Sequence, residues 1–241
     1  MMRIVGLDPS LTNTGVALLE DGKCVDVHTV KTCRGSIPAR YLWIEQEVGQ
    51  VLRKFKPHVI GCERYLTGKE SSEDLYALQV ILQLVMVRLR CRVAFLLPNQ
   101  WRSVFYDRRG LAEFGKVSPS LDADLDMLEA KLDDKQAVIR RMKAETGFSK
   151  VNSHEAEAYY IALVAGRFFA YVDGDLVRKD LTDSERYVFD RPESSRTVFD
   201  QDDDPMPMTG LVHRKNLAWF DFRTEEDLLW VMGTLEKKKG R

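Results

Sequence analysis

The hydrophobic residues of the first hundred positions recur with two different periods, and the period changes from segment to segment. Residues 3–8, 14–19 and 23–32 are short runs rich in β-branched and apolar side chains, which favour extended strands. The pair Asp21-Gly22 lies between the second and third runs and is typical of a tight hairpin. The chain is therefore expected to begin with three consecutive antiparallel strands.

Two helices and two further strands are expected next. Residues 38–55, bracketed by Pro38 and Pro57, carry apolar side chains at three- and four-residue steps, as a helix requires. A strand follows at 58–63, a helix from 73 to about 90, and a strand at 92–97 that Pro98 ends. The order βββαβαβ predicts an α/β fold: a mixed five-stranded sheet, with its first three strands antiparallel, flanked by helices.

The second half of the chain is less regular. Residues 106–133 read as an insertion with a short helix, and helices are expected at 134–145 and from 152 or 153 to about 171. Beyond 173 come an acidic, proline-containing linker (190–207), an apolar cluster (217–222) and a terminal helix from Thr224. These features predict a core domain at 1–172 and a C-terminal extension at 173–241. The aromatic residues of the extension are expected to pack on the core or extend a dimer, and stacking on nucleobases is the least favoured role because acids surround them.

Composition narrows the class of protein. The 241 residues are 44% hydrophobic and 30% charged, which is an ordinary globular balance. The longest apolar stretch, 78–89, is interrupted by polar residues, so no membrane span is expected. The N-terminus has no signal-peptide layout, and the four cysteines are scattered, as in a reduced cytoplasmic protein. The net charge of −1 gives no indication of a nucleic-acid partner.

Two carboxylates stand where strands end. Asp8 follows Ile4 and Gly6 on one face of the first strand, and Glu63 ends the fourth strand in the equivalent position. Taken alone, Asp8 is better read as a turn residue before Pro9. Two acids at the ends of strands in one sheet need a compensating charge, most economically a divalent cation.

The last core helix supplies a third acidic position. His154 and Glu157 are three residues apart and share one helix face, and Glu157 continues into the apolar stripe that this helix should bury. A glutamate at the mouth of a buried stripe needs a partner. Glu155 points elsewhere and is explained by a capping box with Asn152. His154 alone would be interpreted as a histidine of the helix-cap region. Its spacing to Glu157 is what makes it a candidate ligand.

Three motifs together resemble the RuvC family of Holliday junction resolvases, which are RNase H-like nucleases. They are Gly6-Leu-Asp-Pro-Ser10 with Thr14-Gly15, then Cys62-Glu-Arg64, then His154-x-x-Glu157-Ala158. The resemblance covers about residues 2–170. Longer, divergent versions occur in bacteriophages and other viruses, so the expected setting is the cytoplasm of a bacterium or a virus-infected cell.

The resemblance implies a metal-dependent DNA endonuclease acting as a homodimer on branched DNA, with two Mg²⁺ or Mn²⁺ ions and no small-molecule cofactor. The implied metal ligands are Asp8, Glu63, His154 and Glu157. The family usually has Asp at the last of these positions, so Glu157 is one methylene longer. Lys135 matches a family lysine expected to hold the scissile phosphate, although it also reads as a solvated first-turn lysine. The implied DNA contacts are Arg64, Tyr65, Leu66, Lys69, Arg140, Arg141 and Lys143. The apolar helix at 75–89 is the expected dimer interface, or simply core.

Three alternatives stay open from the sequence. A nucleotide-binding protein of the actin and sugar-kinase type also begins with a strand, an Asp and a Thr-Gly hairpin, but it needs two such domains and a second phosphate loop. A non-catalytic module of the same fold would bind branched DNA without cutting it. The same chemistry could also act on flaps, forks or RNA hybrids.

Overall fold

The computed structural model describes residues 1–32, 35–64, 73–106, 134–189 and 218–221. The expected linker at 190–207, the terminal helix and almost all of the expected insertion at 106–133 lie outside these ranges. So do Phe222 and Trp230. Within the described residues, no helix is long and apolar enough to cross a bilayer.

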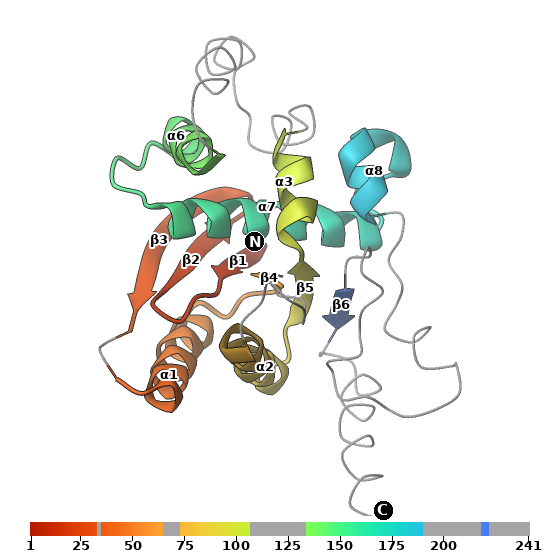
Figure 1. Ribbon diagram of the computed structural model, residues 1–241. Helices are drawn as coiled ribbons and strands as arrows, with labels where there is room; N and C mark the ends of the chain where they lie inside the picture. The colour runs from red at the N-terminus through yellow and green to blue at the C-terminus, as the bar shows by residue number, and fades with distance from the viewer. Residues whose placement is uncertain (33–34, 65–72, 107–133, 190–217, 222–241) are drawn as a thin grey trace, which may run out of the picture.

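The centre of the fold is a mixed sheet with the strand order β3-β2-β1-β4-β5-β6 (Figure 1). Strands β1 (Arg3–Asp8), β2 (Asn13–Glu20) and β3 (Lys23–Lys31) form the predicted antiparallel meander. Strands β4 (Val59–Glu63) and β5 (Arg92–Leu96) continue it in parallel to β1. The sequence-based prediction of five strands was one short, because β6 (Ala218–Asp221) from the C-terminal extension pairs antiparallel with β5.

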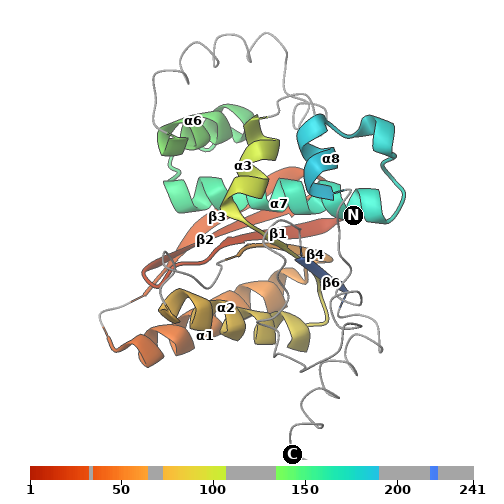
Figure 2. The same ribbon diagram turned by 45° about the vertical axis from the view of Figure 1, so that its right-hand side comes forward.

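Helices cover both faces of this sheet (Figure 2). On one face lie α1 (Ile37–Phe55) and α2 (Glu73–Arg88). On the other face α7 (Ser153–Val172) crosses the strands and is itself covered by α3 (Pro98–Tyr106), α6 (Asp134–Thr146) and α8 (Asp183–Phe189). A short 3₁₀ turn, η1 (Arg178–Asp180), precedes α8. Of these elements, α3, η1 and α8 were not predicted from the sequence.

The two helical layers follow from the alternation of side chains along the strands. In β1, Ile4 packs into the core under α7, and Val5 packs into the core under α1 and α2. The helix α7 is buried along most of its length because the sheet lies beneath it and three helices lie above it. That position explains why its sequence is apolar almost all round.

Three glycines let α7 approach the sheet more closely than any side chain would allow. A Cβ atom built on Gly6 would lie 1.8 Å from the carbonyl oxygen of Ala158, and one on Gly61 would lie 2.6 Å from that of Ile161. One built on Gly15 would lie 2.0 Å from the carbonyl oxygen of His154. The glycines of β1, β2 and β4 therefore determine how closely α7 packs on the sheet. They also determine where the polar residues at the N-terminal end of α7 lie relative to the strands.

Residues beyond 172 pack into the same core. Phe189 of α8 lies edge-on to Phe168 of α7, with ring centroids 5.5 Å apart, and Trp219 of β6 lies 5.9 Å from Phe169. Trp219 and Phe220 therefore pack on the core, which is one of the roles expected for the aromatic cluster. The division of the chain at 172 stays a prediction about domain organisation.

Candidate metal centre

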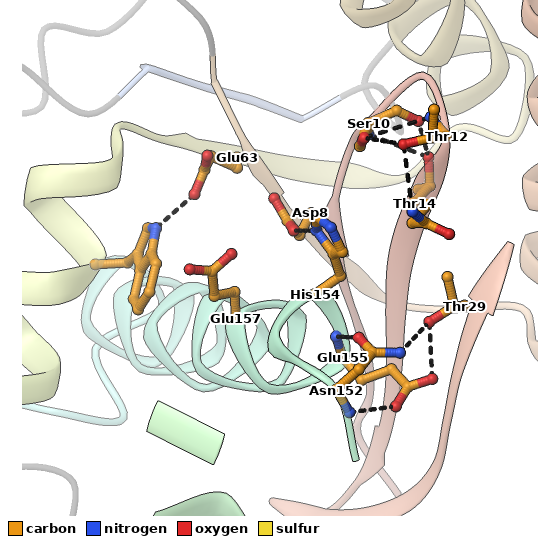
Figure 3. A network of polar contacts seen from close by, with 12 residues as sticks. Asp8, Ser10, Thr12, Thr14, Thr29, Glu63, Asn152, His154, Glu155 and Glu157 are labelled. Atoms are coloured by element: carbon orange, nitrogen blue, oxygen red, sulfur yellow. Dashed lines mark hydrogen bonds and ion pairs between the residues drawn. The ribbon is translucent and has the colours of Figure 1, made fainter. Parts of the chain in front are cut away.

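Asp8 and Glu63 lie at the carboxyl ends of two adjacent parallel strands. The register pairs Leu7 of β1 with Cys62 of β4, so the next residue on each strand is one of the two acids. Both are buried: 3% of Asp8 and 6% of Glu63 is exposed to solvent. The placement predicted from the strand pattern is confirmed, since the two acids share one edge of the sheet (Figure 3).

The N-terminal end of α7 brings two more groups to Asp8. The helix begins after Asn152 with the predicted capping box, in which the Asn152 side chain accepts from the Glu155 N–H and Glu155 accepts from the Asn152 N–H. His154 Nδ1 lies 2.5 Å from Asp8 Oδ2. Ligand atoms of Asp8, His154 and Glu157 all lie within 4.8 Å of one another (Figure 3). Three of the four predicted ligands thus form one compact cluster, and Glu63 borders it.

The helix α3 supplies two side chains that the sequence-based analysis did not identify. The buried indole Nε1–H of Trp101 donates a 2.7 Å hydrogen bond to Glu63 Oε2. Arg102 Nη2 donates to Glu157 Oε1 at 3.2 Å, which gives Glu157 the partner that its burial requires. The available signal was Pro98, which is favoured at the first position of a helix and had been interpreted only as the end of a strand.

The centre holds more negative charge than its cations neutralise. Burial raises the pKa of Glu63 to about 8, and the charges of Asp8 and Glu157 add to that rise against the opposing Trp101 hydrogen bond. Burial and Asp8 also raise the pKa of Glu157, while Arg102 and Lys135 act in the opposite direction. The hydrogen bond to Asp8 raises the pKa of His154. Clustered oxygen ligands with this excess charge fit a divalent cation.

Lys135 is exposed in the first turn of α6. Its charge acts on both His154 and Glu157, so it lies within electrostatic reach of the cluster. Within α6, Arg141 and Glu145 form a buried ion pair at 2.9 Å, and Glu145 also accepts a 3.0 Å hydrogen bond from the Tyr160 hydroxyl of α7. This hydrogen bond joins α7 to the helix that carries Lys135.

The predicted DNA contacts divide into three groups. Arg140 is exposed and Lys143 half-buried on α6, so both are available to a ligand. Arg64 and Arg141 are 4% and 2% exposed, and Arg141 pairs with Glu145, so little of either side chain is open to solvent, and their role as DNA contacts stays a prediction. Burial lowers the pKa of Arg64 to about 10. The remaining three positions, Tyr65, Leu66 and Lys69, lie outside the described residues.

Known proteins are similar in sequence to part of this chain. Residues 4–108 match the sequence model of the family described as crossover junction endodeoxyribonuclease RuvC. RuvC of Mycolicibacterium vanbaalenii is 30% identical over 107 residues, which are 41% of this chain and 55% of that protein. RuvC of Saccharopolyspora erythraea is 27% identical over 137 residues, which are 54% of this chain and 68% of that protein. The chain thus spans little more than half the length of the first of these relatives.

Solved structures extend the likeness of the fold. RuvC of Thermus thermophilus in complex with a Holliday junction substrate superposes with a TM-score of 0.52 at 19% identity, covering 71% of this chain and 96% of that one. A second structure of T. thermophilus RuvC gives 0.51 at the same identity, with 71% and 97% covered. At this identity the two structures show the fold alone.

The sheet order, the helix crossing it and the carboxylate–histidine cluster define an RNase H-like α/β domain. Within that class, residues 4–108 match the sequence model of the RuvC family. The resemblance inferred from three short motifs is confirmed.

Proposed function

We propose that this protein is a metal-dependent endodeoxyribonuclease that resolves four-way DNA junctions. The observation that carries the proposal is the cluster of Asp8, His154 and Glu157, with ligand atoms within 4.8 Å of one another, beside a buried Glu63 in a RuvC-family domain. Two of the relatives are named crossover junction endodeoxyribonucleases, which is the activity proposed here.

In this proposal Asp8, Glu63, His154 and Glu157 hold two Mg²⁺ or Mn²⁺ ions. Bound ions of this kind activate a water molecule and stabilise the charge on the leaving oxygen of a phosphodiester. The donor set supports such ions because three of its four members are carboxylates, and the imidazole of His154 favours Mn²⁺ slightly. Asp8, at the centre of the cluster, contacts His154 directly and adds to the pKa rise of Glu63 and Glu157.

The cations around the cluster are proposed to position the substrate. Lys135 lies within electrostatic reach of His154 and Glu157, and we assign it to the scissile phosphate. Arg102 holds Glu157 in place and keeps a partly exposed guanidinium beside it. Arg140 and Lys143 are proposed backbone contacts, since phosphate contacts orient DNA without reading its sequence. The same role stays a proposal for Tyr65, Leu66 and Lys69.

Symmetric cutting of a four-way junction calls for a two-fold dimer. We propose that α2 forms its interface, because Leu84 on that helix is 43% exposed while Leu78, Leu82 and Met86 on the same helix are buried. The same side of the sheet carries Leu42 and Trp43 of α1, which are 69% and 42% exposed. A cytoplasmic location in a bacterium or an infected cell completes the proposal.

The deciding experiment offers the protein a synthetic immobile junction beside a Y-fork, a flap and a linear duplex, in Mg²⁺ and in Mn²⁺. Paired symmetric nicks in the junction that disappear in Asp8→Asn are the expected result. Equal cutting of forks and flaps would replace the proposal with a broader debranching nuclease. Tight junction binding with no cutting in either metal would leave a structure-specific DNA-binding protein.

A further inference from the structure

The segment after α7 carries a basic hollow that lies away from the metal cluster. Arg178, Lys179 and Arg186 line a surface hollow of about 440 Å³. Two of these residues come from η1 and one from α8, so the hollow belongs to the C-terminal extension. The family match at residues 4–108 ends well before this segment.

Three cations line this hollow, and the segment that carries them also holds the exposed acids Asp175, Asp180 and Asp183. Arg186 is fixed in place, because its Nε and Nη2 donate to the Leu181 carbonyl oxygen at 3.1 and 3.0 Å and its Nη1 lies 3.1 Å from Asp183. Two other acids of the segment are neutralised elsewhere: Glu185 pairs with the buried Arg167, and Asp173 pairs with Arg92.

The hollow lies on the same face of the sheet as the metal cluster. Helix α8 packs on the C-terminal half of α7, through Phe168 and Phe189, in the layer that also holds α3 and α6 (Figures 1 and 2). Glu157 is near the other end of α7. At about 1.5 Å of rise per residue, the helix axis advances roughly 15 Å from Glu157 to Arg167 and roughly 24 Å from Glu157 to Asp173. Duplex DNA covers that distance in about 4.4 to 7 base pairs at ~3.4 Å each.

We propose that Arg178, Lys179 and Arg186 form a second DNA-backbone site, which holds the phosphates of a junction arm about 4.4 to 7 base pairs from the cleaved bond. This inference rests on the proposed function and names a part of the substrate that the metal cluster does not reach. Three cations spread along one open hollow fit a stretch of sugar-phosphate backbone better than a single phosphate ion.

The test compares two triple variants of the full chain in the Asp8→Asn background, so that binding is measured without cutting. One carries Arg178→Gln, Lys179→Gln and Arg186→Gln. The control carries Arg53→Gln, Lys54→Gln and Lys56→Gln, which removes three exposed cations at the end of α1, on the opposite face of the sheet. Fluorescence anisotropy gives the Kd for a labelled junction with 15-base-pair arms at several salt concentrations.

We expect the hollow variant to bind at least about 10-fold more weakly at 100 mM salt, and its plot of log Kd against log salt to be shallower by about 2–3, near one for each lost phosphate contact. The control should stay within about twofold of the parent. On a junction with hairpin-capped arms of four base pairs, which end short of the hollow, the two variants should bind equally. If the hollow variant and the control variant bind the long-armed junction with equal Kd, the inference is overturned.

A structural effect of the substitutions is separated by charge-preserving changes. Arg178→Lys with Arg186→Lys should retain parental binding, and a loss as large as that of the triple variant would overturn the inference. Failure of the proposed function gives a different result: the parent itself would bind the junction no better than a linear duplex. In that case, weaker binding of the hollow variant to long duplexes, with unchanged binding to short ones, would still support the hollow as a DNA-backbone site.

Discussion

Gly15 of β2 lies directly beneath His154: a Cβ atom built on the glycine would be 2.0 Å from the histidine carbonyl oxygen. The first turn of α7 therefore packs directly against the backbone of β2, with no side chain between them. The position of His154, and its 2.5 Å contact with Asp8, depends on the absence of a single side chain on a neighbouring strand.

Substituting Gly15→Ala should therefore displace the start of α7. We expect a loss of about 2–3 kcal/mol in the free energy of unfolding, as overpacking usually costs. Junction cleavage should fall by about 100-fold, because catalytic groups displaced by about 1 Å lose that much. Urea unfolding and cleavage assays measure the two effects. The matched control is Gly35→Ala, where the added Cβ would meet only Ala39 at 3.6 Å and both quantities should be unchanged. An active, stable Gly15→Ala protein would contradict this account of the helix position.

Trp101 should affect the pH dependence of cleavage through Glu63. Replacing Trp101→Phe removes the 2.7 Å hydrogen bond from the indole N–H, which opposes the rise in the pKa of that carboxyl. Glu63 should then be protonated up to a higher pH, so cleavage should drop about 10-fold at pH 7, the equivalent of about one pKa unit, and recover toward pH 9.

The control for this prediction is Trp219→Phe, because the buried Nε1 of Trp219 has no hydrogen-bond partner among the described residues. Its pH–rate profile should keep the shape of the parent profile. A Trp101→Phe protein whose activity falls by the same factor at every pH would show that Trp101 only fills space.

The metal-free protein should lose stability as the pH rises. Burial and the neighbouring carboxylates raise the pKa of Glu63 from 4.5 to about 8 in the folded state, so between these values the folded protein holds a proton that the unfolded chain has released. Stability is then highest below about pH 4.5 and declines through this window, with a limiting slope on the order of 1.4 kcal/mol per pH unit. The raised pKa values of Glu157 and His154 act in the same direction.

Thermal unfolding in EDTA between pH 5 and pH 8 measures this decline. Added Mg²⁺ or Mn²⁺ should raise the Tm more at pH 8 than at pH 5, because a metal ion competes with protons for these ligands. Glu63→Gln should flatten the EDTA curve. A parent protein whose Tm is independent of pH in EDTA would contradict the electrostatic description of the centre.

The sequence predicted the elements whose signals are local. The strands β1 to β5 and the helices α1, α2, α6 and α7 occur within a few residues of the expected bounds. Each has its own hydrophobic period and its own residues that favour a beginning or an end. The spacing of His154 and Glu157 was readable for the same reason, since one helix face determines it. Asp8 and Glu63 could be placed together because both end strands of one sheet.

The parts that were missed depend on contacts between distant positions. Helix α3 has nine residues, too few for a clear period, so Trp101 and Arg102 were not connected with Glu63 and Glu157. Strand β6 pairs with β5 across more than a hundred residues, and no local pattern encodes that pairing. The burial of Arg141 is of the same kind, because it follows from the packing of α6 on α7 rather than from its own neighbours.

The ion pair between Arg167 of α7 and Glu185 of α8 is a buried polar contact between the core and the extension. Glu185 also accepts from the Thr182 N–H at 2.9 Å, and its own N–H donates to the Thr182 hydroxyl. Removing one partner leaves a buried charge uncompensated, so Arg167→Met or Glu185→Leu alone should cost about 3–5 kcal/mol in the free energy of unfolding.

The double variant, Arg167→Met with Glu185→Leu, should recover most of that loss, because apolar side chains of similar size replace the pair beside Phe168 and Phe189. Urea unfolding of the four proteins gives the coupling free energy directly. Additive losses would show that the pair does not act as a unit. Since α8 also carries Arg186, either single variant should weaken the binding of long-armed junctions, and the double variant should restore it.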